Sequence, residues 1–142
     1  MIIVPDASVI LKWVLEKGEG VEVSTALDLQ SAFVAGELEL QVPTLWKYEV
    51  GNVLGLKQPQ LAGELMKALL DCELPEVPLT SNYCQAALKL MQEIKDVTFY
   101  DSCYHALAIQ VRGVYVTADK RYLKSASRKG HISLLADWGL AK

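Results

Sequence analysis

The chain has 142 residues, of which 51% are hydrophobic and 22% are charged, and its formal net charge is −3 at neutral pH. No apolar run approaches the roughly 20 residues that a membrane-spanning helix requires, and Pro5 and Asp6 stop the N-terminal apolar run before it is long enough for a secretory signal. We therefore expect a single domain over residues 1–142, located in the cytoplasm.

The three cysteines, Cys72, Cys84 and Cys103, include no C-x-x-C pair. Their number and spacing disfavour both a disulfide framework and a zinc site, and indicate buried reduced thiols.

Short apolar runs alternate with helical periodicity along the chain, which predicts an α/β fold with a parallel sheet and helices on both faces. The expected elements are a strand over residues 2–4, helices over 6–13 and 21–35, a half-buried strand over 38–42, helices over 45–57 and 61–70, an edge strand or extended link over 74–79, helices over 81–95 and 98–112, a strand over 114–117, a polar helix over 119–127 and a short strand over 132–135.

Several residues predict where helices begin and end. Thr44 is the expected N-cap of the helix over residues 45–57, and Thr98 with Asp101 forms a T-x-x-D capping pattern. Gly36 and Gly113 are expected to stop the helices that precede them.

Four acidic residues lie at or near the starts of predicted helices, in segments that are otherwise apolar: Asp6, Glu49, Asp101 and Asp119. Ligand sites in open α/β sheets lie at the carboxyl ends of the strands, so these residues can converge although they are distant in sequence. Carboxylates gathered in one place repel one another at neutral pH unless cations lie among them. An all-oxygen ligand set indicates Mg²⁺ or Mn²⁺.

A purely structural role is an alternative for three of these carboxylates. Asp6 or Ser8 can cap the first helix, Asp101 can complete a capping box, and Asp119 can cap the helix that follows it. Glu49 has no such explanation, because it lies about one turn inside its helix.

Four sequence blocks resemble the PIN-domain ribonucleases, specifically the VapC-type toxins of toxin-antitoxin pairs. The blocks are IVPDASV at residues 3–9, YEVGNVL at 48–54, TFYDSCYHALA at 98–108 and VTADKR at 116–121. Together they follow the family's order over nearly the whole chain. The resemblance implies a PIN-like three-layer sandwich with a central parallel sheet, and a Mg²⁺- or Mn²⁺-dependent endoribonuclease activity.

By this resemblance Asp6, Glu49, Asp101 and Asp119 are the catalytic and metal-binding residues, and Ser8 supports Asp6. Hydrolysis by a metal-activated water needs no side-chain nucleophile. We assign Asp6 and Asp101 as core ligands, Glu49 as a ligand or a base, and Asp119 as a ligand, directly or through water.

The surroundings of the four acidic residues add two expectations. Asn52 follows Glu49 by three residues on the same helical face, where its amide can orient Glu49 or touch the substrate. Relatives often carry a further acidic residue soon after the one at Asp119, but here Lys120 and Arg121 follow, which leaves open whether one or two ions bind.

The basic residues after Asp119 are expected to border the site and to hold RNA phosphates. They are Lys120, Arg121, Lys124, Arg128 and Lys129, and we assign Lys120, Arg121 and Lys124 as the substrate-binding residues. Removing the four acidic site residues from the charge balance leaves a nearly neutral chain, so composition permits a phosphodiester substrate. An ordinary solvated helix face is the alternative for the basic segment. His105, one turn after Asp101, is more simply a structural histidine than a substrate contact.

Other activities fit less well. A haloacid-dehalogenase-type phosphatase needs a second Asp two residues after the first, where Ser8 stands, and a signalling receiver domain needs its Asp and Lys at other strands. A catalytically idle PIN-like binding or scaffold protein is the remaining alternative.

The resemblance also implies partners, namely a small antitoxin that docks a helix beside the site, and a second copy of the chain in a homodimer. We expect the docking groove on the helices over residues 6–13 and 44–57, which carry the large apolar residues Trp13, Leu45, Trp46 and Leu54. Gly51 and Gly55, one turn apart, would let another helix approach closely.

Overall fold

The computed structural model describes residues 1–15 and 21–139. The elements in chain order are β1 (Ile2–Pro5), α1 (Ala7–Lys12), α2 (Val21–Val34), β2 (Glu39–Leu40), β3 (Val42–Pro43), α3 (Trp46–Lys57), α4 (Ala62–Asp71), β4 (Glu76–Val77), α5 (Ser81–Glu93), α6 (Phe99–Gln110), β5 (Val114–Thr117), α7 (Lys120–Ala126), the 3₁₀ turn η1 (Ser127–Lys129), β6 (Ile132–Leu134) and the 3₁₀ turn η2 (Leu135–Asp137).

Two parallel sheets organise these elements. The larger sheet has the order β2-β1-β5-β6, and the smaller one pairs β3 with β4. Strand β1 is central, because Ile3 pairs with Leu40 on one side and with Val114 on the other. Ile3 and Val4 are fully buried, as expected of a β-branched strand covered on both faces.

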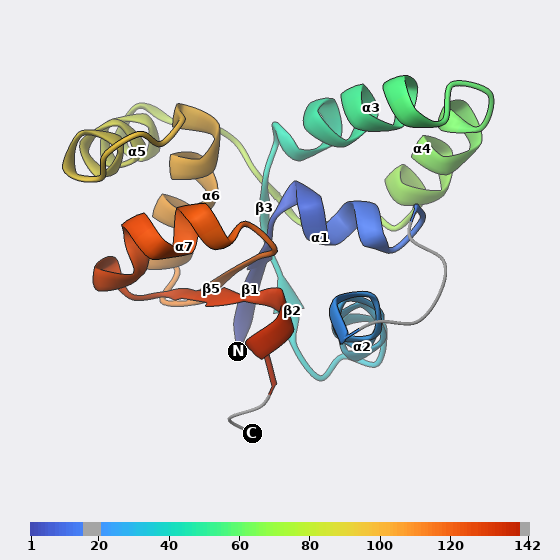
Figure 1. The fold of residues 1–142 in the computed structure, drawn as a ribbon, viewed down its shortest axis with the longest axis horizontal. Helices are drawn as coiled ribbons and strands as arrows, with labels where there is room; N and C mark the ends of the chain where they lie inside the picture. Colours follow the sequence, from blue (N-terminus) through green and yellow to red (C-terminus); the bar gives the residue numbers. More distant parts are fainter. Residues whose placement is uncertain (16–20, 140–142) are drawn as a thin grey trace.

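Helices cover both faces of the larger sheet, so the predicted α/β class is confirmed. In Figure 1, α5, α6 and α7 lie on one side of the sheet, whereas α1 and α2 lie on the other. Helices α3 and α4 pack against each other beyond the carboxyl ends of the strands, at the top of Figure 1. This arrangement leaves the starts of α1, α3, α6 and α7 facing the same end of the sheet.

The half-buried strand expected over residues 38–42 is divided between the two sheets. Leu40 belongs to β2 beside β1, whereas Val42 begins β3, and its amide donates to the carbonyl of Pro75 at 2.9 Å. The apolar alternation predicted the extended backbone, but it carries no information about which distant strand each residue pairs with.

Two predicted helix ends are wrong. Helix α3 has Leu45 rather than Thr44 as its N-cap, and no side chain caps it. After α6 the left-handed residue is Arg112, with φ 57°, and not Gly113. Gly113 is required for another reason: a Cβ at this position would lie 2.4 Å from the carbonyl oxygen of Ile2.

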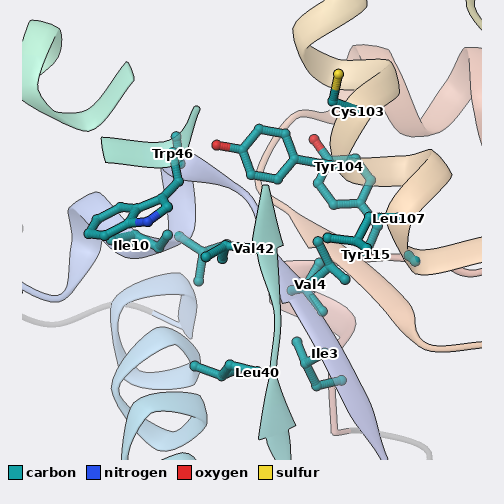
Figure 2. Close-up of a cluster of buried hydrophobic side chains, with 14 of the residues drawn as sticks. Ile3, Val4, Ile10, Leu40, Val42, Trp46, Cys103, Tyr104, Leu107 and Tyr115 are labelled. Carbon is teal, nitrogen blue, oxygen red and sulfur yellow. The ribbon is translucent and has the colours of Figure 1, made fainter. Parts of the chain in front are cut away.

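The expected groove for a partner helix is largely interior. Trp46 is 1% exposed, its indole N–H donates to Glu76 at 2.7 Å, and Figure 2 draws it within the buried core. Leu54 is fully buried, and the indole of Trp13 donates to the carbonyl of Ala26 at 2.9 Å.

The glycines of α3 also differ from expectation. A Cβ on Gly51 would contact Met66 of α4, so the helix that approaches there belongs to the same chain. Gly55 is exposed, and a Cβ there would meet nothing within 4 Å.

The cysteines are free, as expected, but only Cys103 is buried, while Cys84 is half-buried and Cys72 is exposed. Across the described residues, no helix combines the length and the apolarity that crossing a membrane would need.

The close approach at Gly113 generates a prediction. Gly113→Ala should lower the free energy of unfolding by about 2 kcal/mol or more, because the new methyl group meets rigid backbone. The matched control is Gly55→Ala, which should stabilise the protein by up to about 1 kcal/mol because it raises helix propensity in open space. Urea denaturation of both variants measures the difference, and equal stabilities would contradict the packing argument.

Candidate functional site

The carboxyl ends of β1 and β5 bring two acidic loops together. Asp6 follows β1 directly, and its amide donates to the carbonyl of Val116 in β5 at 2.9 Å. Asp119 lies two residues after β5, and the preceding amide of Ala118 donates to the hydroxyl of Ser8 at 3.3 Å. The turns that carry Asp6 and Asp119 are therefore tied to each other.

The carboxylate of Asp6 is held at both oxygens. Oδ2 accepts from the amide of Ser8 at 3.1 Å and from its hydroxyl at 2.6 Å, which makes Asp6 the N-cap of α1. Oδ1 accepts from the hydroxyl of Tyr115 at 2.8 Å. Ser8 thus donates twice to the Asp6 carboxylate, and of the two candidate caps it is Asp6 that caps α1.

Glu49 lies in the first turn of α3, where its Oε1 accepts from the hydroxyl of Tyr104 at 2.7 Å. Tyr104 of α6 stacks on Tyr115 of β5, with ring centroids 5.7 Å apart and an angle of 16° between the planes. Figure 2 shows the two rings side by side in the core. One pair of aromatic rings therefore contacts two carboxylates from different parts of the chain.

Asp101 and Asp119 line a cleft of about 110 Å³ together with Arg121. Asp101 lies in the first turn of α6, and its amide donates to the Thr98 hydroxyl at 3.1 Å, as the T-x-x-D pattern predicted. Asp119 caps α7 by accepting from the amide of Tyr122 at 3.1 Å.

The four carboxylates are electrostatic neighbours. Burial, together with the charges of Asp6 and Asp101, raises the pKa of Glu49 to about 7 although the Tyr104 hydrogen bond opposes the shift. Burial and the charges of Asp6 and Asp119 raise the pKa of Asp101 to about 6, against the hydrogen bond from Thr98. Both shifts mean that the ionised site is destabilised when no cation is present.

The donor chemistry suits a hard divalent cation, because carboxylate oxygens are the ligands that Mg²⁺ and Mn²⁺ prefer. The spacing is more open than a closed metal site: within residues 1–15 and 21–139, no three Asp, Glu, His or Cys side chains are grouped closely enough to hold an ion. Like charges favour such a separation until a cation screens them.

Tyr104 and Tyr115 are site residues that the sequence did not reveal. Burial and the neighbouring carboxylates raise the pKa of both hydroxyls above the ordinary value, so both remain protonated donors. Both tyrosines are also part of the buried core. The sequence holds a partial signal for Tyr115. Residues two apart in a strand share a face, so Tyr115 lies on the same face of β5 as Thr117, the last residue of the strand before Asp119.

The other predicted residues separate into two groups. Lys120, Arg121 and Lys124 are exposed on α7, and Arg121 lines the cleft beside Asp101 and Asp119. Asn52 is exposed one turn after Glu49. The basic residues further along the chain are held by α5 instead: Arg128 donates to the carbonyl of Glu93, and Lys129 forms an ion pair with the Glu93 carboxylate.

His105 is structural, as its position suggested. The ring is fully buried, with Nδ1 2.8 Å from the hydroxyl of Tyr122 and Nε2 2.8 Å from the carbonyl of Gly130. Burial lowers its pKa, which favours the neutral imidazole.

The raised pKa of Glu49 generates a prediction for the metal-free protein. Below about pH 4.5 the Glu49 carboxyl is protonated in both the folded and the unfolded state, and above about pH 7 it is ionised in both. Ionisation of the buried carboxyl raises the free energy of the folded state, whereas the solvated carboxyl of the unfolded state ionises without this penalty. Stability should therefore fall as the pH rises through this window.

Glu49→Gln keeps an acceptor for Tyr104 and removes the charge. In EDTA it should flatten the fall and raise the free energy of unfolding at about pH 8 by on the order of 1 kcal/mol, after allowance for solvent screening. Asp28→Asn, at an exposed position of α2, is the control. Denaturation curves at several pH values measure the effect, and a lower stability of Glu49→Gln at high pH would show that the carboxylate is structural.

Several solved structures have a similar fold. VapBC2 from Rickettsia felis, bound to a DNA fragment from its promoter, has a TM-score of 0.68 at 13% identity, and the match covers 94% of this chain and 97% of that one. A toxin-antitoxin complex from Klebsiella pneumoniae gives 0.67 at 15% identity over 94% and 97%. VapC20 from Mycobacterium tuberculosis, a toxin that cleaves the sarcin-ricin loop, gives 0.65 at 16% identity over 91% and 95%.

The TM-scores and coverages establish a shared fold, whereas the identities are low. No curated protein sequence is significantly similar to this chain. The sequence model of the PIN domain matches residues 3–129, which include Asp6, Glu49, Asp101 and Asp119. With that match over most of its length, and with the parallel sheet and helical layers described above, this chain belongs to the PIN-domain family.

Proposed function

We propose that this protein is a divalent-metal-dependent endoribonuclease, acting in the cytoplasm as the toxin of a toxin-antitoxin pair. Its substrate would be an RNA phosphodiester bond, hydrolysed by a metal-activated water within one PIN domain over residues 1–142. Membership of the PIN-domain family supports a nuclease, and the similar folds of VapC20 and of two toxin-antitoxin complexes support the toxin role.

The observation that carries the proposal is the environment of Glu49. Its carboxylate lies half-buried near Asp6 and Asp101, and these surroundings raise its pKa to about 7. If the only role of this carboxylate were a favourable interaction with the dipole at the N-terminus of α3, its charged form would be stabilised and its pKa would not be raised. An acid kept at such a cost beside two others is typical of a site that binds a cation or moves a proton.

The proposed division of labour follows from these contacts. Asp6, Glu49, Asp101 and Asp119 would hold Mg²⁺ or Mn²⁺, which when bound would supply an activated water and stabilise charge on the scissile phosphate. Ser8 and Tyr115 orient Asp6, while Tyr104 holds Oε1 of Glu49 and leaves Oε2 available as a ligand or a base.

A direct test is cleavage of defined RNAs with Mg²⁺ or Mn²⁺. EDTA should abolish cleavage, and Asp6→Asn or Asp101→Asn should reduce the rate by roughly 100-fold or more, because each removes a ligand charge at nearly constant shape. Asp28→Asn should cleave like the wild type. Full activity in folded Asp6→Asn and Asp101→Asn proteins would refute the mechanism, whereas a wild type that binds Mn²⁺ without cleaving any RNA would favour the idle binding protein.

We further propose that Lys120, Arg121 and Lys124 hold RNA phosphates. Arg121 is placed for this role because it lines the cleft beside two of the carboxylates. In an inactive Asp101→Asn background, Arg121→Ala should weaken the binding of all RNA sequences alike and reduce the slope of log K against log salt by about 1. Lys67→Ala, at a lysine paired with Asp71 on α4, is the control. An unchanged slope in Arg121→Ala would show that the basic residues of α7 form an ordinary solvated helix face.

The partners we propose are a small antitoxin and a second copy of the chain. Since Trp46 and Leu54 are interior, we place the docking surface on the outward face of α3, which carries Tyr48 at 73% and Leu56 at 77% exposure beside Gly55. This face lies on the helix that positions Glu49, so a docked helix would adjoin the site.

Co-expression with the neighbouring open reading frame tests this surface. The double change Tyr48→Glu and Leu56→Glu should abolish co-purification and relieve inhibition without lowering stability, because both side chains are exposed. Leu88→Glu on α5 is the control, and size-exclusion chromatography of each variant reports the proposed homodimer. If the antitoxin still inhibits the double variant, it binds at another surface, and the nuclease assignment is not affected.

A further inference from the structure

The hydroxyls of Tyr104 and Tyr115 donate to the two carboxylates at the centre of the site. Tyr104 donates to Oε1 of Glu49 at 2.7 Å, and Tyr115 donates to Oδ1 of Asp6 at 2.8 Å. The two residues come from different elements, α6 and β5, and their rings stack in the buried core (Figure 2).

Burial and stacking give these hydroxyls fixed positions. The exposed fraction is 0% for Tyr104 and 1% for Tyr115, and the Tyr115 ring also meets His105 and Tyr122 at centroid distances of 5.9 and 5.6 Å. A tyrosine side chain has only two rotatable bonds before its hydroxyl, so packing of the ring determines where the proton is donated. The two hydroxyls therefore meet Asp6 and Glu49 at positions that the packed rings define.

Buried tyrosines elsewhere in the protein show that a carboxylate partner is not needed to satisfy the hydroxyl. Tyr83 donates to the backbone carbonyl of Cys103, and the hydroxyl of Tyr122 pairs with Nδ1 of His105. Only Tyr104 and Tyr115, among the tyrosine contacts described here, use a side-chain carboxylate. Each carboxylate oxygen can accept more than one interaction, so a donor at one lone pair leaves another lone pair for a cation.

We propose that Tyr104 and Tyr115 are positioning residues, which orient the carboxylates of Glu49 and Asp6 for a divalent cation. This inference rests on the proposed function, because it supposes that these carboxylates bind the ion. Neither tyrosine would touch the substrate; each acts through the oxygen to which it donates. Removing such an outer partner of a metal ligand typically weakens metal binding although the ligand remains.

The test is the affinity of the RNA-free protein for Mn²⁺, measured by isothermal titration calorimetry. Tyr104→Phe and Tyr115→Phe retain the stacked rings and remove one hydroxyl each, and both should bind Mn²⁺ roughly 10-fold more weakly than the wild type. Tyr122→Phe is the matched control, since it removes a buried hydroxyl of the same cluster that bonds to His105 rather than to a carboxylate. This control should bind like the wild type.

A spectroscopic measurement separates positioning from a general loss of packing. Titration with Mg²⁺ should perturb the near-ultraviolet tyrosine spectrum of the wild type and of Tyr122→Phe. In each site variant the remaining site tyrosine should respond only at higher Mg²⁺ concentration, while thermal melts show that the variant is folded. Wild-type affinity in folded Tyr104→Phe and Tyr115→Phe, or an equal loss in Tyr122→Phe, would overturn the positioning role. Failure of the wild type itself to bind Mn²⁺ would instead refute the proposed function on which this inference depends.

Discussion

The pairing of β1 with β5 determines where the carboxylates of this protein lie. Parallel alignment of the two strands puts Asp6 and the turn before Asp119 at the same edge of the sheet, and the amide of Asp6 extends the ladder by donating to Val116. In the register of this pair, Ile3 lies beside Val114 and Val4 beside Tyr115. A shift by one residue would turn Tyr115 away from Asp6 and separate the aromatic pair from the carboxylates.

The site combines structural and chemical roles in the same residues. Asp6 and Asp119 cap helices, and Thr98 caps the helix that carries Asp101, so the capping alternatives describe real contacts. They do not account for the raised pKa of Asp101 or of Glu49, since a cap alone stabilises the charged form of a carboxylate. The same carboxylates therefore stabilise the starts of helices and repel one another across the site. Mutual repulsion of this kind is typical of a site that binds a cation.

The interior of the molecule also limits what its surface can do. Trp46 looked suitable for a partner because large apolar residues crowd α3, but its indole donates to Glu76 inside the core. Gly51, which looked like a contact point for a foreign helix, receives Met66 of α4. The outward face of α3, where Tyr48 and Leu56 are exposed, is the surface that we propose for a partner. Composition alone does not separate these two faces, because both carry large apolar groups.

Local patterns in the sequence determined most of the elements and the acidic residues of the candidate site. Strand β5 and the cap of α6 follow directly from a β-branched run and a T-x-x-D pattern, because the interactions that form them lie within a few residues. Only the tertiary structure decided that residues 38–42 divide between two sheets, that Gly113 is needed for contact with Ile2, and that Tyr104 and Tyr115 hold Glu49 and Asp6. These contacts join residues that are far apart in sequence, and neither periodicity nor helix capping contains information about such distances.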